Sequence, residues 1–371
     1  MIKLDDKKVL VAMSGGVDSS VTAALLKSQG YEVIGLHMQL WDAAKQKPNA
    51  IRFGARCCLQ SNLAQAKKTC ERLDIPFHVI NVHHAFEEAV VDYFIHESIQ
   101  SRTPNPCALC NIQIKFNYLL KKADELGCAW MATGHYAQVM HDTAAQAYRL
   151  LKSAEVGRDQ SYFLFGLTQE NLKRSILPIG GIPQKMVLRM ATELGLPSHI
   201  AGPEEICFIE DPRRKAFIDE HVAESLRPRG MVRMGPSEII GEHDGMHGYT
   251  IGQPYGSQVE GGDKSMYVTG FDMTEKTLIV GKESSLMSHD LTAQNVNWIS
   301  PPDGIHSARC TAKIRPSHEP TPCLVTLYEN HTAHVHFDEP EKAITPGQAI
   351  VFYQGPEVLG GGFIHRVSTA Y

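Results

Sequence analysis

The first third of the chain alternates continuous apolar runs with amphipathic stretches. The runs have the length of buried strands and lie at 8–13, 32–38, 77–82 and 129–136. The stretches between them repeat apolar residues at helical spacing, which predicts helices over 18–29, 58–74, 85–100 and 111–127. Because strands that alternate with helices are typical of a parallel, doubly wound sheet, we predict an α/β domain. In such a sheet the site lies beyond the carboxyl ends of the strands.

The pattern changes after about residue 205. A helix is predicted over 213–225, and the stretch 226–262 is rich in Gly, Pro and short apolar segments. From about residue 266, short strands separated by turns indicate a small all-β sandwich or barrel. We therefore predict an α/β domain over 1–209, a small central linking domain over 210–285 and a β-barrel over 286–371.

Composition and charge limit the class of protein only loosely. The 371 residues suffice for two or three domains, and 43% hydrophobic with 21% charged residues is ordinary for a globular protein. No apolar run reaches the roughly 18–20 residues of a membrane-spanning helix, and the N-terminal stretch lacks the features of a signal peptide. We therefore expect a cytoplasmic protein without a membrane partner. The net charge of −5 argues against a surface that is basic throughout, although a local basic face would suffice to bind nucleic acid.

Nine cysteines at irregular spacing argue against a secreted disulfide framework. Cys107 and Cys110 form a Cys-x-x-Cys within "TPNPCALCNIQIKF" (103–116). The spacing alone fits half of a zinc site, a redox pair or a pair of catalytic thiols. We interpret the remaining cysteines, apart from Cys207, as packing or core residues: Cys57, Cys58, Cys70, Cys128, Cys310 and Cys323.

The stretch "VLVAMSGGVDSSVTAALL" is the most informative in the chain. A predicted strand ends at Met13, and the loop 14–20 leads directly into a helix. Its glycines allow close approach of a ligand to the backbone, and helix-start N–H groups with serine hydroxyls form a cradle for an anion. The loop has no lysine, so it is not a Walker-type loop. The alternative is a Gly-Ser turn in which Asp18 and Ser19 cap the helix.

The loop resembles the phosphate loop of the ATP-pyrophosphatase superfamily, whose members adenylate a carbonyl oxygen and release pyrophosphate. Further stretches occur in the order found in bacterial tRNA-specific 2-thiouridylases, and together they span nearly the whole chain. They are "GLHMQLWD" (35–42), "TPNPCALCNIQIKF" (103–116), "ATGHYA" (132–137), "GRDQSYFLFGL" (157–167), "ICFIED" (206–211), "GYTIGQ" (248–253) and "TPGQAIVFYQGPEVLGGGFI" (345–364).

The resemblance implies ATP-dependent 2-thiolation of the wobble uridine in tRNAs for Lys, Glu and Gln. ATP would adenylate the C2 oxygen, sulfur would displace AMP, and Mg²⁺ would be held by Asp18. The same resemblance implies a catalytic α/β domain, a tRNA-contacting barrel and a sulfur supply from a persulfide-carrying relay protein or a cysteine desulfurase. Cys207 would carry the persulfide, and Cys110 would be the second catalytic cysteine.

Other roles carry over by position. Residues implied to bind ATP are Ala12, Met13, Ser14, Gly15, Gly16, Val17, Asp18, Ser19, Met38 and Gly134. Asn105, Pro106 and Cys107 would border the target base. Residues implied to contact tRNA are His135, Arg158, Asp159, Gln160, Arg315, Pro316 and Gln348.

Two departures from the family pattern bear on chemistry. Cys107 replaces an aspartate, and "GQPYGS" (252–257) replaces "GQRKGL", which loses two basic residues. Since thiolates favour iron–sulfur clusters or zinc, Cys107, Cys110 and Cys207 could instead hold a [4Fe-4S] cluster whose fourth iron binds sulfide. The persulfide and cluster mechanisms both remain open, whereas a structural zinc lacks a second ligand pair at the usual spacing.

Several features admit simpler interpretations. Basic residues between 213 and 233 predict a phosphate track or an ordinary charged helix face. His334 and His336 alternate along a strand, which favours a solvated face over a metal site. Rival functions are a synthetase that adenylates a small metabolite, which would need a glutaminase domain or partner, and a zinc-stabilised RNA-binding module.

Overall fold

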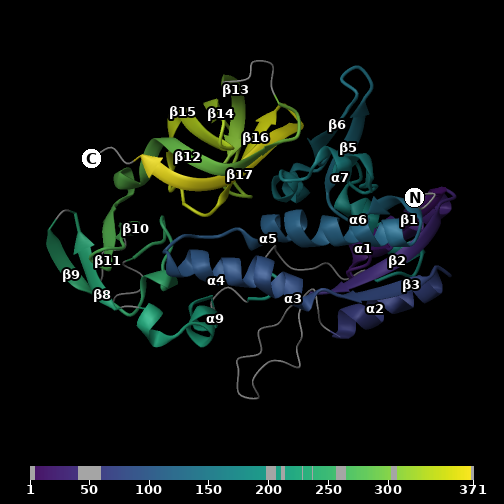
Figure 1. Cartoon of the computed structure of the whole chain (residues 1–371), viewed down its shortest axis with the longest axis horizontal. Helices are drawn as coiled ribbons and strands as arrows, with labels where there is room; N and C mark the ends of the chain where they lie inside the picture. The colour runs from purple at the N-terminus through teal and green to yellow at the C-terminus, as the bar shows by residue number, and fades with distance from the viewer. Residues whose placement is uncertain are drawn as a thin grey trace.

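The computed structural model describes residues 5–40, 60–197, 206–209, 214–227, 229–235, 237–255, 265–301 and 307–368. Figure 1 shows three regions: a parallel sheet with its helices, a small central sheet to the left and a barrel above. Among the described helices, none is long and apolar enough to cross a membrane.

The parallel sheet of the described chain has the strand order β3-β2-β1-β4-β7. Its strands are β1 (Asp5–Ala12), β2 (Glu32–Gln39), β3 (Phe77–Asn81), β4 (Cys128–Ala132) and β7 (Ser175–Ile176). Each neighbouring pair is parallel. The chain builds β2 and β3 on one side of β1 and places β4 on the other, so the topological switch point lies between β1 and β4.

Helices cover both faces of this sheet, which explains the continuous apolar runs of its strands. Val9 and Val11 of β1 pack with α1 (Val17–Ser28) and α2 (Gln60–Arg72). Leu10 packs on the opposite face with α6 (Phe116–Glu125). The doubly wound sheet predicted from the sequence is therefore confirmed.

Two predicted helices are present but contain a wider turn. The first runs through α3 (His83–Phe86), a π-helical segment over Glu87–Val91 and α4 (Asp92–Ile99). The second runs through α5 (Pro106–Leu109), a π-helical segment over Cys110–Lys115 and α6. π-Helical segments inside α-helices occur frequently at functional sites, and the second one begins at Cys110.

The central sheet of the described chain has the order β10-β11-β8-β9. Its strands are β8 (Gly230–Met234), β9 (Glu238–His243), β10 (Met266–Asp272) and β11 (Thr277–Lys282). The sequence pattern that begins near residue 266 therefore does not belong wholly to a barrel, since β11 pairs with β8. Helix α9 (Arg214–His221) precedes this sheet, and the predicted helix over 213–225 is accordingly shorter.

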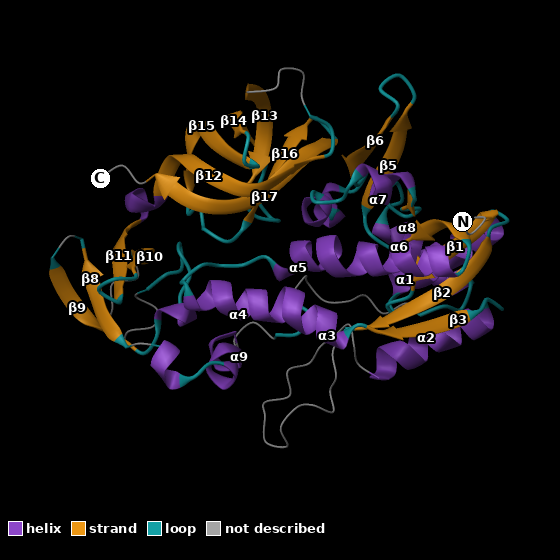
Figure 2. Cartoon of the chain, viewed as in Figure 1, coloured by secondary structure: helices purple, strands orange, loops and turns teal. Residues whose placement is uncertain are grey.

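Six described strands close an antiparallel barrel, because β12 pairs with both β15 and β17. They are β12 (Met287–Trp298), β13 (Ser307–Lys313), β14 (Thr321–Tyr328), β15 (Thr332–Lys342), β16 (Ala349–Gln354) and β17 (Glu357–Ser368). A hairpin of β5 (Ala137–Asp142) and β6 (Ala147–Lys152) leaves the α/β region and pairs with β17. Figure 2 shows this hairpin beside the barrel. Sequence patterns did not predict this connection.

Two further helices complete the described α/β region, α7 (Gln169–Lys173) and α8 (Gln184–Glu193). The α8 side chains Val187 and Ala191 pack with Val17, Val21 and Ala24 of α1. The packing of α8 against α1 therefore supports the helix that follows the phosphate loop.

Candidate active site

The loop after β1 lies at the switch point of the parallel sheet. Gly15 has a φ of +87°, and a Cβ there would lie 2.3 Å from the backbone oxygen of Asn62 in α2. Gly134 follows β4, and a Cβ there would lie 2.8 Å from the backbone carbon of Asp18. Both glycines are thus required by close backbone packing, which brings the ends of β1 and β4 together.

The serines of the loop bond to one another and to the backbone. Ser14 N donates to Ser19 Oγ at 3.2 Å, and Ser19 Oγ donates to the Gly16 carbonyl at 3.1 Å. Gly16 is the N-cap of α1, and it has no side chain that could cap the first N–H groups of the helix. The simpler alternative, in which Asp18 and Ser19 cap the helix, has no support in these hydrogen bonds. These N–H groups can serve an anion.

Met13 and Val17, unlike the serines, have side chains that point away from the predicted ATP site into the core. Both side chains are buried in apolar clusters, so their backbone is what a ligand at the loop could contact. Met38 is half-buried at the end of β2 and packs against two clusters, one of which contains Cys110.

Burial lowers the pKa of His37, the residue before Met38, and its Nδ1 lies 2.7 Å from the Met13 carbonyl. A neutral His37 thereby holds the end of β1.

Asp18 is fixed by a residue that sequence reasoning did not single out. Tyr136 Oη donates to Asp18 Oδ1 at 2.9 Å. Burial raises the pKa of Asp18, although the Tyr136 hydrogen bond and the positive charge of Arg158 oppose this. A desolvated carboxylate near helix-start N–H groups is suited to binding a hard cation such as Mg²⁺.

The segment 158–160 packs directly against Tyr136, the hydrogen-bond partner of Asp18. The Tyr136 backbone N–H donates to Gln160 Oε1 at 2.9 Å, and Gln160 N donates to the Tyr136 carbonyl at 2.9 Å. Asp159 Oδ1 accepts hydrogen bonds from Ser153 N and Ser161 N at 3.0 and 3.1 Å. The guanidinium carbon of Arg158 lies 5.6 Å from the centroid of the Tyr136 ring. Two residues that the resemblance assigns to tRNA, Arg158 and Gln160, thus contact the tyrosine that holds Asp18, whereas Asp159 orders its own segment.

His135 is held as a neutral imidazole. Its Nδ1 lies 2.7 Å from Thr133 Oγ1, and its ring lies 5.8 Å from that of Phe116. Burial, followed by the positive charge of Lys115, lowers the pKa of His135 to about 3. The ring is therefore uncharged at neutral pH and can contact a ligand by hydrogen bonding or stacking.

The Cys-x-x-Cys begins the second π-containing helix. Asn105 is its N-cap, with Oδ1 accepting from Ala108 N at 3.1 Å, and Pro106 occupies the first turn. Cys107 is half-buried and Cys110 is buried. The buried Tyr162 donates to the Ala349 carbonyl in the barrel at 2.8 Å. The predicted target-base residues lie where the α/β region meets the barrel, because the segment just before them bonds to the barrel residue Gln348.

Cys207 reaches the same place from a distant part of the sequence. Phe208 is buried and packs edge-on against Phe86 and Phe94, with ring centroids 5.7 and 5.5 Å apart. Cys207 is half-buried and packs against the apolar cluster that includes Cys110. The structure therefore brings the two predicted catalytic cysteines to one cluster.

The three thiols do not assemble a metal site. All three lie in described segments, and among the described residues no three His, Cys, Asp or Glu side chains are placed to hold a metal ion. A [4Fe-4S] cluster would need three converging protein thiolates at this position, so the arrangement does not fit that group.

The predicted tRNA contacts in the barrel lie in two environments. Pro316 is exposed, whereas Arg315 is half-buried and donates to the Lys342 carbonyl at 3.3 Å. Gln348 turns inward, and its Nε2 donates to the Thr103 carbonyl at 3.0 Å and to the Pro104 carbonyl at 3.5 Å. Gln348 therefore bonds to the segment that precedes Cys107.

Other sequence features proved structural. Lys215 pairs with Asp219 and Asp244, and Arg227 also pairs with Asp219, which favours a charged face over a phosphate track. Tyr255 of "GQPYGS" is buried in the apolar cluster of the central sheet. His334 and His336 both pair with Asp290 on the barrel surface. Cys70, Cys128 and Cys323 are buried and Cys310 is half-buried, while Cys57, Cys58, Arg213 and the residues 256–257 of "GQPYGS" lie outside the described residues.

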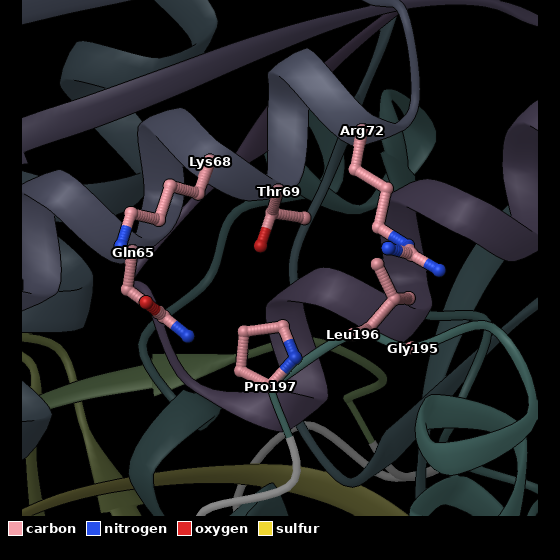
Figure 3. A pocket seen from close by; sticks show the side chains of 7 residues that line it. All are labelled: Gln65, Lys68, Thr69, Arg72, Gly195, Leu196 and Pro197. Atoms are coloured by element: carbon pink, nitrogen blue, oxygen red, sulfur yellow. The ribbon is translucent and has the colours of Figure 1, made fainter.

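A pocket of about 530 Å³ lies between α2 and the end of α8. Figure 3 shows Lys68 and Arg72 on α2 above Leu196 and Pro197. Arg72 Nε donates to the Leu194 carbonyl at 2.6 Å, and Thr69 contacts Ser20 of α1 at 3.3 Å. None of the predicted site residues lines the pocket. It therefore lies on the flank of the phosphate loop's supporting helices rather than at the cysteines.

The fold and the loop at its switch point define an ATP-pyrophosphatase-type domain, a class of enzymes that uses ATP with Mg²⁺. A family model described as a tRNA methyl transferase HUP domain matches residues 7–211. A tRNA methyl transferase PRC-barrel domain matches 215–282, and an aminomethyltransferase beta-barrel domain matches 288–364.

Curated relatives match almost end to end. The tRNA-specific 2-thiouridylase of Geotalea uraniireducens is 44% identical over 98% of this chain and 96% of its own length. The enzyme of Geobacter metallireducens is 43% identical over 98% of both, and that of Clostridioides difficile 39% over 97% and 99%. The chain belongs to the tRNA-specific 2-thiouridylase family, whose members are sulfurtransferases.

Proposed function

We propose that this chain is a tRNA-uridine 2-sulfurtransferase that thiolates the wobble uridine of tRNAs for Lys, Glu and Gln. The observation that carries the proposal is the convergence of Cys110 and Cys207 on one cluster, which Met38 links to the phosphate-loop sheet. We further propose that 1–209 form the catalytic domain, 210–285 the linking domain and 286–371 the tRNA-contacting barrel. Location in the cytoplasm belongs to the same proposal, since tRNA is the substrate.

The first half of the reaction takes place at the phosphate loop. Residues 12–19, with Met38 and Gly134, hold ATP, and Asp18 would hold Mg²⁺, which would supply positive charge beside the phosphates. The C2 oxygen of uracil attacks the α-phosphorus, the bond from the α-phosphorus to the bridging oxygen breaks, and pyrophosphate leaves with the electron pair. Asn105, Pro106 and Cys107 border the base, which is recognised after leaving its stack. His135, Arg315, Pro316 and Gln348 are the other proposed tRNA contacts.

Sulfur transfer then uses the two cysteines. Cys207 carries a persulfide received from a relay protein or a cysteine desulfurase. Either Cys110 attacks Cys207 Sγ and releases hydrosulfide, which attacks C2, or the persulfide attacks C2 first and Cys110 then attacks Cys207 Sγ. Both routes expel AMP and end with a Cys110–Cys207 disulfide, which an external thiol must reduce before the next turnover. The [4Fe-4S] alternative lacks a converging ligand set, and no step is assigned to it.

Substitution of Cys207 by alanine separates the two half-reactions. Cys207→Ala should release AMP and pyrophosphate in a tRNA-dependent manner but form no 2-thiouridine, because only the sulfur carrier is lost. Cys310→Ala, a half-buried barrel cysteine, is the matched control and should behave as wild type. Normal thiouridine yield from Cys207→Ala would overturn the assignment. ATP turnover that requires no tRNA would favour the small-metabolite synthetase, and no turnover at all would favour the RNA-binding module.

A further inference from the structure

Arg158 has a buried donor that the described chain does not use. Its Nε is buried and has no hydrogen-bond partner among the described residues. A buried guanidinium donor left without an acceptor is costly, so such a group is usually satisfied by a ligand, an ion or water. The role that the resemblance gives Arg158 is contact with tRNA.

The surroundings of Arg158 point toward the phosphate loop instead. Its guanidinium lies 5.6 Å from the Tyr136 ring, and the hydroxyl of that ring is 2.9 Å from Asp18 Oδ1. The charge of Arg158 acts on the Asp18 carboxylate. Gln160 binds both backbone polar groups of Tyr136, so the segment that carries Arg158 is fixed relative to the loop.

We propose that Arg158 binds the triphosphate of ATP and stabilises the departing pyrophosphate, rather than a phosphate of tRNA. This inference rests on the proposed function of the site and assigns one more residue to it. When the bond between the α-phosphorus and its bridging oxygen breaks, the electron pair stays on pyrophosphate. The guanidinium of Arg158, whose positive charge already acts on Asp18, would stabilise this negative charge. Guanidinium is suited to the task because its fork of donors matches phosphate oxygens.

The test compares binding of two ligands by Arg158→Gln. We expect MgATP binding without tRNA, measured by calorimetry, to weaken about 10- to 100-fold, the usual effect of losing a charge-assisted hydrogen bond. Inorganic pyrophosphate should weaken as an inhibitor by a similar factor. Affinity for tRNA, and the slope of its logarithm against that of salt concentration, should not change. Arg158→Lys should restore most of the MgATP affinity because it keeps the charge.

Arg189→Gln is the matched control, since Arg189 is an exposed residue of α8 paired with Glu193. Unchanged MgATP affinity in Arg158→Gln, together with weaker tRNA binding and a salt slope lower by about one, would overturn the inference and restore the tRNA contact. If wild type thiolates tRNA and this variant binds MgATP normally, only the inference fails. If wild type neither binds MgATP nor thiolates tRNA, the proposed function fails.

Discussion

At the residue scale, the site depends on charged groups that the fold partly desolvates. Asp18 lies in the first turn of α1 and is tied to Tyr136 rather than to the helix backbone. Burial raises the pKa of its carboxyl above the ordinary 3.8, so ionising it in the empty site costs free energy. A bound cation offsets this cost because it restores a partner to the carboxylate.

Asp18→Asn should therefore stabilise the ligand-free protein at neutral pH. A group whose folded-state pKa is raised contributes most to stability below its unfolded pKa of about 3.9 and loses that contribution as pH rises through the folded value. The asparagine has no such loss, so its advantage in urea midpoint should be present at pH 7 and shrink toward pH 4. An advantage of equal size at both pH values would contradict desolvation of the carboxylate as the cause. The variant should also lose pyrophosphate release.

At the element scale, one segment connects the regions of the molecule. Thr103 N donates to the Pro346 carbonyl at 2.8 Å, and Arg102 Nη2 donates to the Ile364 carbonyl at 3.1 Å. Arg214, at the start of α9, donates to the Arg102 carbonyl at 3.4 Å. The segment before Cys107 is thus held by both the barrel and the central region. Sequence motifs placed Cys107 and Gln348 in one family pattern, but only the fold shows that Gln348 bonds to the segment before Cys107.

Gln348→Leu tests whether the barrel positions the cysteine segment. Losing the amide donor to Thr103 should raise local opening about five-fold, the effect of roughly 1 kcal/mol. Alkylation of Cys107 by iodoacetamide, followed by peptide mass spectrometry, should accelerate accordingly. Gln354→Leu, at an exposed position on β16, is the control. An unchanged alkylation rate combined with weaker tRNA binding would instead favour a direct tRNA contact for Gln348.

At the scale of the whole molecule, local patterns predicted elements better than long-range contacts. Period and run length gave the parallel sheet and its loop, because both follow from local chemistry and burial. The pairing of β6 with β17 and of β8 with β11 joins segments far apart in sequence, and no local signal specifies it. No local signal predicts the role of Tyr136 either, because this role depends on its hydrogen bond to the distant Asp18. A tyrosine next to the Gly-His step was visible in the sequence, but its partner was not.

The central claim is that ATP drives sulfur onto the wobble uridine of tRNA through Cys110 and Cys207. The most direct measurement is nucleoside mass spectrometry of tRNA for Lys, Glu or Gln after incubation with the purified chain, MgATP and a persulfide donor. We expect 2-thiouridine at the wobble position with wild type, and none without ATP or with Cys110→Ala or Cys207→Ala. Absence of the thiolated nucleoside with wild type, or its formation without ATP, would contradict this claim.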